Sequence, residues 1–428
     1  MRHLKFLTAL LGVAVAAAAF AAAFRATLAW WYHAVFHAND VVDAMAKLPR
    51  WLRVLVPAAG GCAAGLIARL RAGSRQGVSN VMEAVALGNV RLSFRTTLSR
   101  VLSSWTAMAG GLSIGREGPL IEFGGTVGAS IARLTSAPLL DTRVLVASGT
   151  AAGFAAAYNT PFAAVLFVFE TILGIAAPAA LVPTIGAVVL STALIRWIVG
   201  SGPIYGQRLF ALQSQTELLA FAALGLLAAI AALGFKRLLA WFEHLAARYP
   251  IPQPFRATIG GLLVGMIALG LPAVAGNGYE PLNLILDQRI ALTAVAILLV
   301  AKIVATSGSV SSGVPGGIFT PTLLVGASLG TLWAHAISLA FPGTPVSAGS
   351  YALVGMAAAT AASIHAPLTA AVLVFELSGD YPIVLPLLLA TAIAAAMSRR
   401  LGSQSVYDAE LSRKGVGWEL TLEGRQLK

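Results

Sequence analysis

The feature that most constrains this chain is a run of residues without charge. No Asp, Glu, Lys or Arg occurs between positions 303 and 375, and this run is several times longer than the ~20 apolar residues of one membrane-spanning helix. Shorter uncharged runs of spanning length cover 6–24, 171–195 and 218–235. Only 11% of the 428 residues are charged, against about a quarter in a soluble domain. The sequence therefore predicts an all-α, polytopic membrane protein.

The basic residues indicate how the chain is oriented. The formal net charge is +12, and basic side chains flank the apolar segments, where cytoplasmic loop charges collect. We expect a multi-pass protein of the inner membrane with both termini in the cytoplasm. Nucleic acid is not expected as a partner, because the basic residues form no compact run with interleaved aromatics. The flanking residues are Arg2, Lys5, Arg69, Arg71, Lys236, Arg237, Arg399, Arg400, Arg413 and Lys414.

One membrane domain, 1–412, is expected, followed by a short cytoplasmic tail, 413–428. The apolar run 6–24 lies behind two basic residues and resembles a signal peptide, but it exceeds the about 7–15 apolar residues typical of one. We therefore expect it to form the first membrane helix. The tail is too short for a regulatory module.

Few residues in this sequence suggest metal binding. The single cysteine, Cys62, excludes an intrachain disulfide and a thiolate metal site. The six histidines are scattered and form no ligand motif. We expect neither a metal nor a cofactor.

An internal repeat divides the membrane domain. The segment 149–170 matches 355–376 at a shift of 206 residues, and 115–119 matches 317–321 at a shift of 202. The matched residues include Gly149 with Gly355, Pro161 with Pro367 and Glu170 with Glu376. Duplicated halves with interrupted helices in matching positions are typical of secondary transporters and their relatives. We place the halves at about 1–205 and 206–412.

Two matched segments, 110–125 and 311–326, are candidates for an anion site. Each has Gly and Pro at the start of an apolar, helix-like run. Proline suits the first helical turn, and glycine lets a ligand approach the backbone closely. A helix N-terminus presents free N–H groups and about half a positive charge. Two such ends directed at one place would bind an anion without a buried cation.

Glu117 lies in the first of these segments, beside Arg116. A carboxylate at an anion-binding helix end can compete with the transported anion for the same amides, and protonation can release them. This chemistry predicts a gate that responds to pH and to the anion. The structural alternative is that Glu117 pairs with Arg116 and only holds the loop.

These motifs resemble those of the chloride channel/transporter (CLC) family. The resemblance rests on GREGP at 115–119, GGIFTP at 316–321 and VYDAEL at 406–411, and covers nearly the whole membrane domain. It implies a homodimer with one pore per subunit. Each subunit would consist of two inverted repeats of tilted, broken helices. Lipid and chloride, or a similar small anion, are the implied partners, with chloride ions bound in the pore.

The resemblance also assigns roles to single residues. Glu117 matches the external gating glutamate, and the amides around Arg116 and Gly118 match the external anion site. The amides of Ile318 and Phe319 match the donors to the central anion. Tyr407 matches the tyrosine whose hydroxyl closes that site; taken alone, it would be an interfacial tyrosine.

The first motif departs from the family pattern. The family has GSGIP, whose serine hydroxyl contacts the central anion, whereas this chain reads RAGSRQGVSN over 71–80. An ungapped match puts Gln76 at the serine position, an insertion puts Ser74 there, and Ser79 is a third candidate. Anion selectivity therefore stays open.

A second departure concerns protons. Exchangers of the family carry an internal glutamate directly after the residue that Glu170 matches, and here that position is Thr171. A threonine hydroxyl cannot take up and release a proton as a carrier near neutral pH, because it does not ionise there. Glu170 is a proton-pathway candidate one position away, but one helical step turns a side chain by about 100°. Glu376 occupies the same position in the second half of the repeat, and this shared position favours a structural role for both glutamates.

The sequence thus favours a chloride channel gated by a pore glutamate, with a Cl⁻/H⁺ antiporter as the alternative. No enzyme is expected. The G-x-S-x-G pattern at 111–115 and 326–330 would fit an intramembrane serine protease with Ser311 or Ser312 and His335 or His365, but we interpret it as helix packing. Tyr407 and GREGP argue against the fluoride-exporting branch, and the tail is too short for nucleotide-binding CBS modules.

Overall fold

The computed structural model describes residues 2–69, 77–87, 92–173, 177–202, 204–206, 214–343, 346–413, 418–421 and 424–427. Nearly all of the ordered structure is helical, which confirms the predicted fold class. The first half contributes α1 Arg2–Phe36, α2 Val41–Lys47, α3 Arg50–Arg69, α4 Val78–Leu87, α5 Phe94–Ala109, α6 Glu117–Leu134, α7 Leu139–Tyr158, α8 Pro161–Val168, the π-helical turn η1 Phe169–Leu173 and α9 Pro178–Val199. The second half contributes α10 Glu217–Arg248, α11 Gln253–Ala268, the 3₁₀ turn η2 Pro272–Val274, α12 Tyr279–Leu286, α13 Leu292–Ser311, α14 Phe319–Ala340, α15 Ala348–Ile364, α16 Pro367–Ser378, α17 Val384–Arg400 and α18 Val406–Arg413.

Six described helical segments are long and apolar enough to cross a membrane. They are 2–47, 50–69, 178–199, 217–248, 292–311 and 319–340. Their outward faces carry large apolar side chains, and Trp197 is 85% exposed in the isolated chain. Such a surface suits lipid rather than water. These features agree with the multi-pass membrane protein that the uncharged runs predict.

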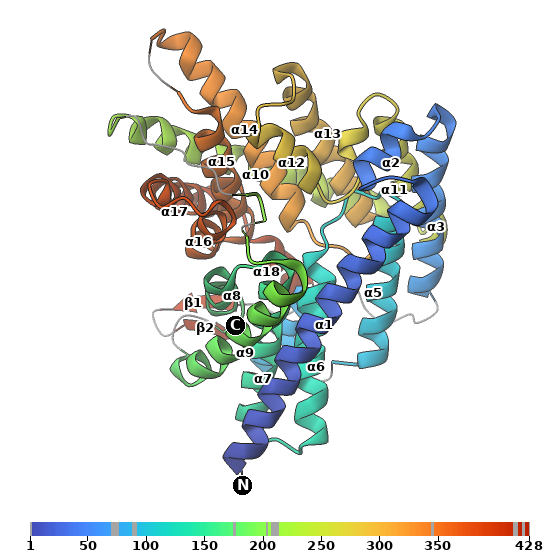
Figure 1. Cartoon of the computed structure of the whole chain (residues 1–428), viewed down its shortest axis with the longest axis vertical. Coiled ribbons are helices and arrows are strands. Elements are labelled where there is room, and N and C mark those ends of the chain that lie inside the picture. Colours follow the sequence, from blue (N-terminus) through green and yellow to red (C-terminus); the bar gives the residue numbers. More distant parts are fainter. Residues whose placement is uncertain are drawn as a thin grey trace.

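Glycines let the helices around the centre approach closely. A Cβ on Gly124 of α6 would collide with the carbonyl oxygen of Gly149 on α7, and the repeat counterparts Gly326 and Gly355 make the same contact between α14 and α15. Small residues permit such backbone approach between membrane helices. In Figure 1, α6, α7 and α9 fill the lower part of the molecule, and α14, α15 and α17 the upper part.

The two halves cap one another's helices reciprocally. The carboxylate of Glu170 accepts hydrogen bonds from the amides of Leu368 and Thr369 at the start of α16, at 3.1 and 2.6 Å. Glu376 accepts from Phe162 and Ala163 at the start of α8, at 3.0 and 2.8 Å. A carboxylate satisfies the free N–H groups and the positive end of a helix N-terminus. Contacts that are reciprocal in this way are those of two units related by a two-fold axis.

The tail adds the only described strands. β1 Trp418–Thr421 pairs antiparallel with β2 Gly424–Leu427, with Trp418 opposite Leu427. The sequence predicts no strand here. The hairpin follows α18 in the chain.

Candidate functional site

Two interrupted segments meet at the centre of the molecule. The amide of Gly115 donates to the carbonyl oxygen of Gly317 at 2.6 Å, and the amide of Gly317 donates back to Gly115 at 2.9 Å. These glycines are repeat counterparts, 202 residues apart. α6 begins two residues after Gly115, at Glu117, and α14 begins two residues after Gly317, at Phe319. The two helix N-termini that the sequence singles out therefore start side by side.

The carboxylate of Glu117 lies on the N-terminus of α14. Its Oε1 accepts hydrogen bonds from the amides of Phe319 at 2.8 Å and Thr320 at 3.3 Å. Its Oε2 accepts from the Thr320 hydroxyl at 3.0 Å. The Glu117 side chain is only 1% exposed. An anion of the chain itself thus occupies the positive end of α14, where a free anion would otherwise bind.

Glycine is required on both sides of this carboxylate. A Cβ on Gly115 or on Gly317 would collide with the carboxylate of Glu117, and one on Gly118 would lie 3.2 Å from the amide nitrogen of Gly317. The bare backbone lets these groups approach where any side chain would exclude them. Removal of the carboxylate would leave space for a small anion at this position.

Thr320 and Tyr158 complete the hydrogen bonding at the site. The Tyr158 hydroxyl lies 2.8 Å from the Thr320 hydroxyl oxygen, and both side chains are buried. If Thr320 donates to Glu117, it accepts from Tyr158. The sequence analysis missed both residues. Thr320 could have been found from its position directly after the expected amide donors, whereas Tyr158 shows no such signal.

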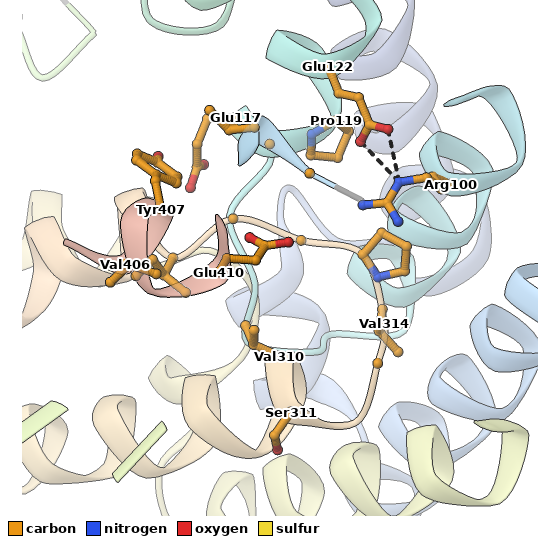
Figure 2. A pocket seen from close by; sticks show the side chains of 18 of the residues that line it. Arg100, Glu117, Pro119, Glu122, Val310, Ser311, Val314, Val406, Tyr407 and Glu410 are labelled. Carbon is orange, nitrogen blue, oxygen red and sulfur yellow. Dashed lines mark hydrogen bonds and ion pairs between the residues drawn. The ribbon is translucent and has the colours of Figure 1, made fainter. Parts of the chain in front are cut away.

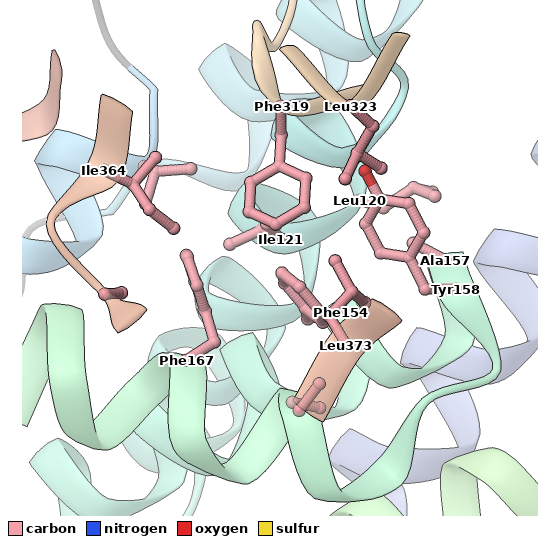
Figure 3. Close-up of a cluster of buried hydrophobic side chains, with 14 of the residues drawn as sticks. Leu120, Ile121, Phe154, Ala157, Tyr158, Phe167, Phe319, Leu323, Ile364 and Leu373 are labelled. Atoms are coloured by element: carbon pink, nitrogen blue, oxygen red, sulfur yellow. The ribbon is translucent and has the colours of Figure 1, made fainter. Parts of the chain in front are cut away.

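An aromatic cluster fixes Phe319 beneath the site (Figure 3). The Phe319 ring lies 5.6 Å from the rings of Phe154 and Tyr158, and the Phe154 contact is edge-to-face. Phe154 also stacks on Phe167 at 4.7 Å. Aromatic pairs in these arrangements are worth about 0.5–1.5 kcal/mol each beyond burial. The packing holds the first amide of α14 in position.

Tyr407 and Glu117 line a common cavity (Figure 2). The cavity of about 160 Å³ is bounded by the loop 313–318, by the start of α6 and by α18. Tyr407 is 8% exposed, and its ring and that of Phe167 form an edge-to-face pair with centroids 6.2 Å apart. Tyr407 comes from the end of the membrane domain, so tertiary structure brings it to the two repeat segments.

Ile318, Gly118 and Arg116 surround the carboxylate without bonding it. Ile318 precedes α14 as its N-cap residue and lines the cavity together with Gly118. The guanidinium of Arg116 lies 5.9 Å from the centre of the Tyr279 ring, a cation–π contact. The groups that donate hydrogen bonds to Glu117 belong to Phe319 and Thr320. The carboxylate of Glu117 is therefore bonded to α14 and not to its sequence neighbour Arg116.

The first-motif candidates are only partly placed. Ser74 and Gln76 lie outside the described residues. Ser79 lies in the first turn of α4 and is fully buried. Gly77 and Val78, just before it, line the cavity. This segment therefore reaches the cavity wall.

The proton-pathway candidate Glu170 and its neighbour Thr171 are engaged elsewhere. The hydroxyl of Thr171 is buried within η1 and donates to the carbonyl oxygen of Phe167. Glu170 caps α16, as described above, and also accepts from the Thr369 hydroxyl at 2.6 Å. Neither residue lines the cavity beside Glu117.

The histidines and serines considered for other chemistry have separate partners. His365 Nε2 lies 3.2 Å from the Ser398 hydroxyl, while Ser311 and Ser312 donate to backbone carbonyls of α13. Within the described ranges, no group of three His, Cys, Asp or Glu side chains is placed to hold a metal ion.

The sequence matches a known protein family. Residues 59–399 match the family model of the voltage-gated chloride channel. A putative ClcB-like chloride channel protein of Ralstonia nicotianae is 38% identical over 393 residues, covering 90% of this chain and 91% of that protein. The voltage-gated ClC-type chloride channel ClcB of Citrobacter koseri is 32% identical, covering 87% and 91%.

Solved structures show the same fold. A slow cyanobacterial Cl⁻/H⁺ antiporter superimposes with a TM-score of 0.87 at 23% identity, covering 96% of this chain and 98% of the other. A CLC-type fluoride/proton antiporter gives a TM-score of 0.75 at 22% identity, covering 94% and 96%. With the family model matching most of its length, this chain belongs to the voltage-gated chloride channel (CLC) family of channels and transporters.

Proposed function

We propose that this chain is a chloride channel of the inner membrane whose gate is the carboxylate of Glu117. The observation that carries the proposal is the position of this carboxylate on the amides of Phe319 and Thr320. Relatives more than 30% identical over most of the chain bear the names of chloride channels. The chain needs no cofactor for this role and is not an enzyme; bound chloride ions are its ligands.

Competition between two anions would operate the gate. Ionised Glu117 receives charge-assisted hydrogen bonds, which are about twice as strong as neutral ones. Protonation removes the charge and turns one oxygen into a donor, so the acid no longer suits a set of N–H and O–H donors. Chloride would then take the place of the carboxylate. Because helix amides carry only partial charge, the ion binds weakly enough to leave again.

The remaining site residues would hold chloride along the path. The amides of Ile318 and Phe319 would bind the central ion, with the Tyr407 hydroxyl closing that position toward α18. The amides around Arg116 and Gly118 would bind the outer ion. Ser74, which lies outside the described residues, is a further candidate ligand. Glu170, as a cap of α16, is proposed as structural rather than proton-carrying.

A Cl⁻/H⁺ antiporter is the second candidate, because a carboxylate that competes with chloride for one position can also carry a proton. Thr171 at the place of the family's internal glutamate, with its hydroxyl bonded to Phe167, favours the channel.

We further propose a homodimer with both termini in the cytoplasm. An apolar groove between α8, α9, α16 and α17 supports a second copy as its occupant, and it is lined by side chains including Phe162, Ile185, Val189, Tyr381 and Leu388. In this dimer, residues 1–412 of each subunit would form one pore surrounded by lipid. The tail 413–428 would follow the membrane domain on the cytoplasmic side.

Reconstitution in chloride-loaded liposomes tests the function. Chloride efflux and external pH are recorded together, for the parent chain and for Glu117→Ala. Chloride efflux without coupled proton movement is expected. Proton movement against its gradient, lost in Glu117→Ala, would identify the antiporter instead, and absence of anion flux in both proteins would refute the proposal.

A further inference from the structure

The cavity beside Glu117 is lined by three other carboxylates. Glu122 lies five residues after Glu117 on α6, Glu243 lies on α10, and Glu410 lies on α18, three residues after Tyr407. Residues three apart on a helix face the same side. Figure 2 shows Glu117, Tyr407 and Glu410 around the same space. Acidic side chains other than Glu117 therefore face the cavity that the gate borders.

The three carboxylates differ in their partners. Both oxygens of Glu122 accept from Nε of Arg100, at 3.0 and 3.1 Å, and Glu122 is only 3% exposed. Glu243 has interaction partners of its own. Glu410 is half-buried, and no hydrogen bond or ion pair engages it within the part of the chain that the structure describes. Of the three, Glu410 is the one whose oxygens face the cavity uncommitted.

Charged and titratable groups on several neighbouring elements surround Glu410. Its oxygen Oε2 and Nη2 of Arg100 each lie 3.9 Å from the point where a Cβ on Gly77 would be, so this guanidinium is a nearby positive charge. On its own helix are Tyr407 and Asp408, and Asp408 is bound to Ser405. α4, which packs on α18, carries Glu83, whereas the adjoining α15 carries no charged residue.

We infer that Glu410 is the residue that passes protons from the α18 side of the membrane to Glu117. This inference rests on the proposed gating role of Glu117. Exchangers of the family carry a proton-transferring glutamate at the position of Thr171. In this chain the Thr171 hydroxyl donates to the carbonyl of Phe167, so the inference assigns proton transfer to Glu410 of α18 instead.

The transfer consists of two balanced steps. Protonated Glu410 gives its proton to a water molecule in the cavity, and that water gives a proton to a carboxylate oxygen of Glu117. Glu410, again ionised, then takes a proton from the solution on the α18 side. A cavity of about 160 Å³ has room for several waters, since each occupies ~30 Å³ of liquid volume. Neutral Glu117 leaves the amides of Phe319 and Thr320, and the gate opens.

The experiment sets the pH separately on the two sides of the membrane. The full chain is reconstituted in liposomes, and protease cleavage of the tail after α18 reports its orientation. Chloride efflux is measured while the α18 side is acidified, and then while the opposite side is acidified. The variants are Glu410→Gln and Glu410→His, with Glu243→Gln as the matched control that removes the same charge from the same cavity.

The parent chain should pass more chloride as the α18 side becomes acidic, by up to about tenfold per pH unit, as for one titrating group. Glu410→Gln should lose this response and keep the response to the opposite side, which also shows that it is folded. Glu410→His should retain a response, because histidine titrates, and Glu243→Gln should behave like the parent.

Two results would overturn the inference. One is an unchanged response to α18-side pH in Glu410→Gln. The other is an equal loss in Glu410→Gln and Glu243→Gln, which would assign the effect to the charge of the cavity rather than to a relay. Absence of chloride flux in the parent chain is a separate result, because it would refute the proposed function itself.

Discussion

The amide of Phe319 donates a 2.8 Å hydrogen bond to the carboxylate of Glu117, a residue 202 positions earlier in the chain. Each residue begins a helix, α14 and α6 respectively, and the two helices occupy matching places in the repeat. The contact means that the N-terminus of one half is blocked by an acid from the other. In the proposed function, movement of this single side chain would expose the amides of α14 and so couple the gate to the anion site.

Neutralising the gate should open it. In Glu117→Gln the charge that holds the side chain on α14 is absent, and hydrogen bonds to charged groups are worth about 1.5–3 kcal/mol. Chloride efflux from liposomes should rise by about tenfold or more and become independent of pH, whereas flux through the parent chain should rise as pH falls. Glu117→Asp, which keeps the charge on a shorter side chain, serves as the control. A pH-dependent flux in Glu117→Gln would contradict this role.

A methyl group at Gly317 should displace the carboxylate. A Cβ there would overlap Glu117, so in Gly317→Ala the side chain of Glu117 must leave its position or the loop must shift. We expect altered flux and a lower melting temperature. Gly234→Ala is the matched control, because a Cβ at Gly234 of α10 meets nothing within 4 Å; this change should stabilise the helix by about 0.5–1 kcal/mol. Equal chloride flux and equal melting temperature in the two variants would show that the close contact between Gly317 and Glu117 is not needed.

The hydroxyl of Thr320 should hold the gate closed. Thr320→Val removes a donor to Glu117 Oε2 while keeping the shape of the side chain, and should weaken the closed state by about 1–2 kcal/mol. Chloride efflux at neutral pH should therefore increase several-fold. Thr331→Val removes a hydroxyl of the same helix that donates only to the carbonyl of Ala327, and it should leave flux unchanged. If both variants conduct like the parent, Thr320 does not act on the gate.

The reciprocal glutamates should behave as a pair. Glu170→Gln and Glu376→Gln each weaken the cap of one helix N-terminus, and loss of such a cap costs about 1–2 kcal/mol. Thermal unfolding in detergent should show similar drops in melting temperature for both. The pH dependence of chloride efflux should stay that of the parent in each. A loss of pH dependence in Glu170→Gln alone would assign Glu170 to a proton pathway after all.

Much of the architecture could be predicted because it depends on local properties. Uncharged runs must become helices in lipid, since backbone groups find no partner there except within the segment. The Gly and Pro residues around positions 115–119 and 317–321 mark helix starts for equally local reasons. Glu117 stands out because a carboxylate at such a start can compete with a free anion for the helix amides.

The site as a whole could not be predicted, because its contacts join distant residues. Tyr158 carries no sequence signal, yet its hydroxyl reaches Thr320, 162 positions away. Glu410 is an ordinary polar residue on a short helix until α18 packs beside the repeat segments. The direction of the Glu170 side chain, toward α16 rather than the cavity, follows from how the halves pack.

The sequence alone therefore determined that this chain spans a membrane as helices and where those helices are interrupted, since apolar runs and backbone-breaking residues act within a few positions. Only the tertiary structure decided which interruptions meet. Glu117 reaches the amides of α14 because two glycines, Gly115 and Gly317, pair across the repeat and leave no side chain between them. That close approach exists only when both halves are folded together.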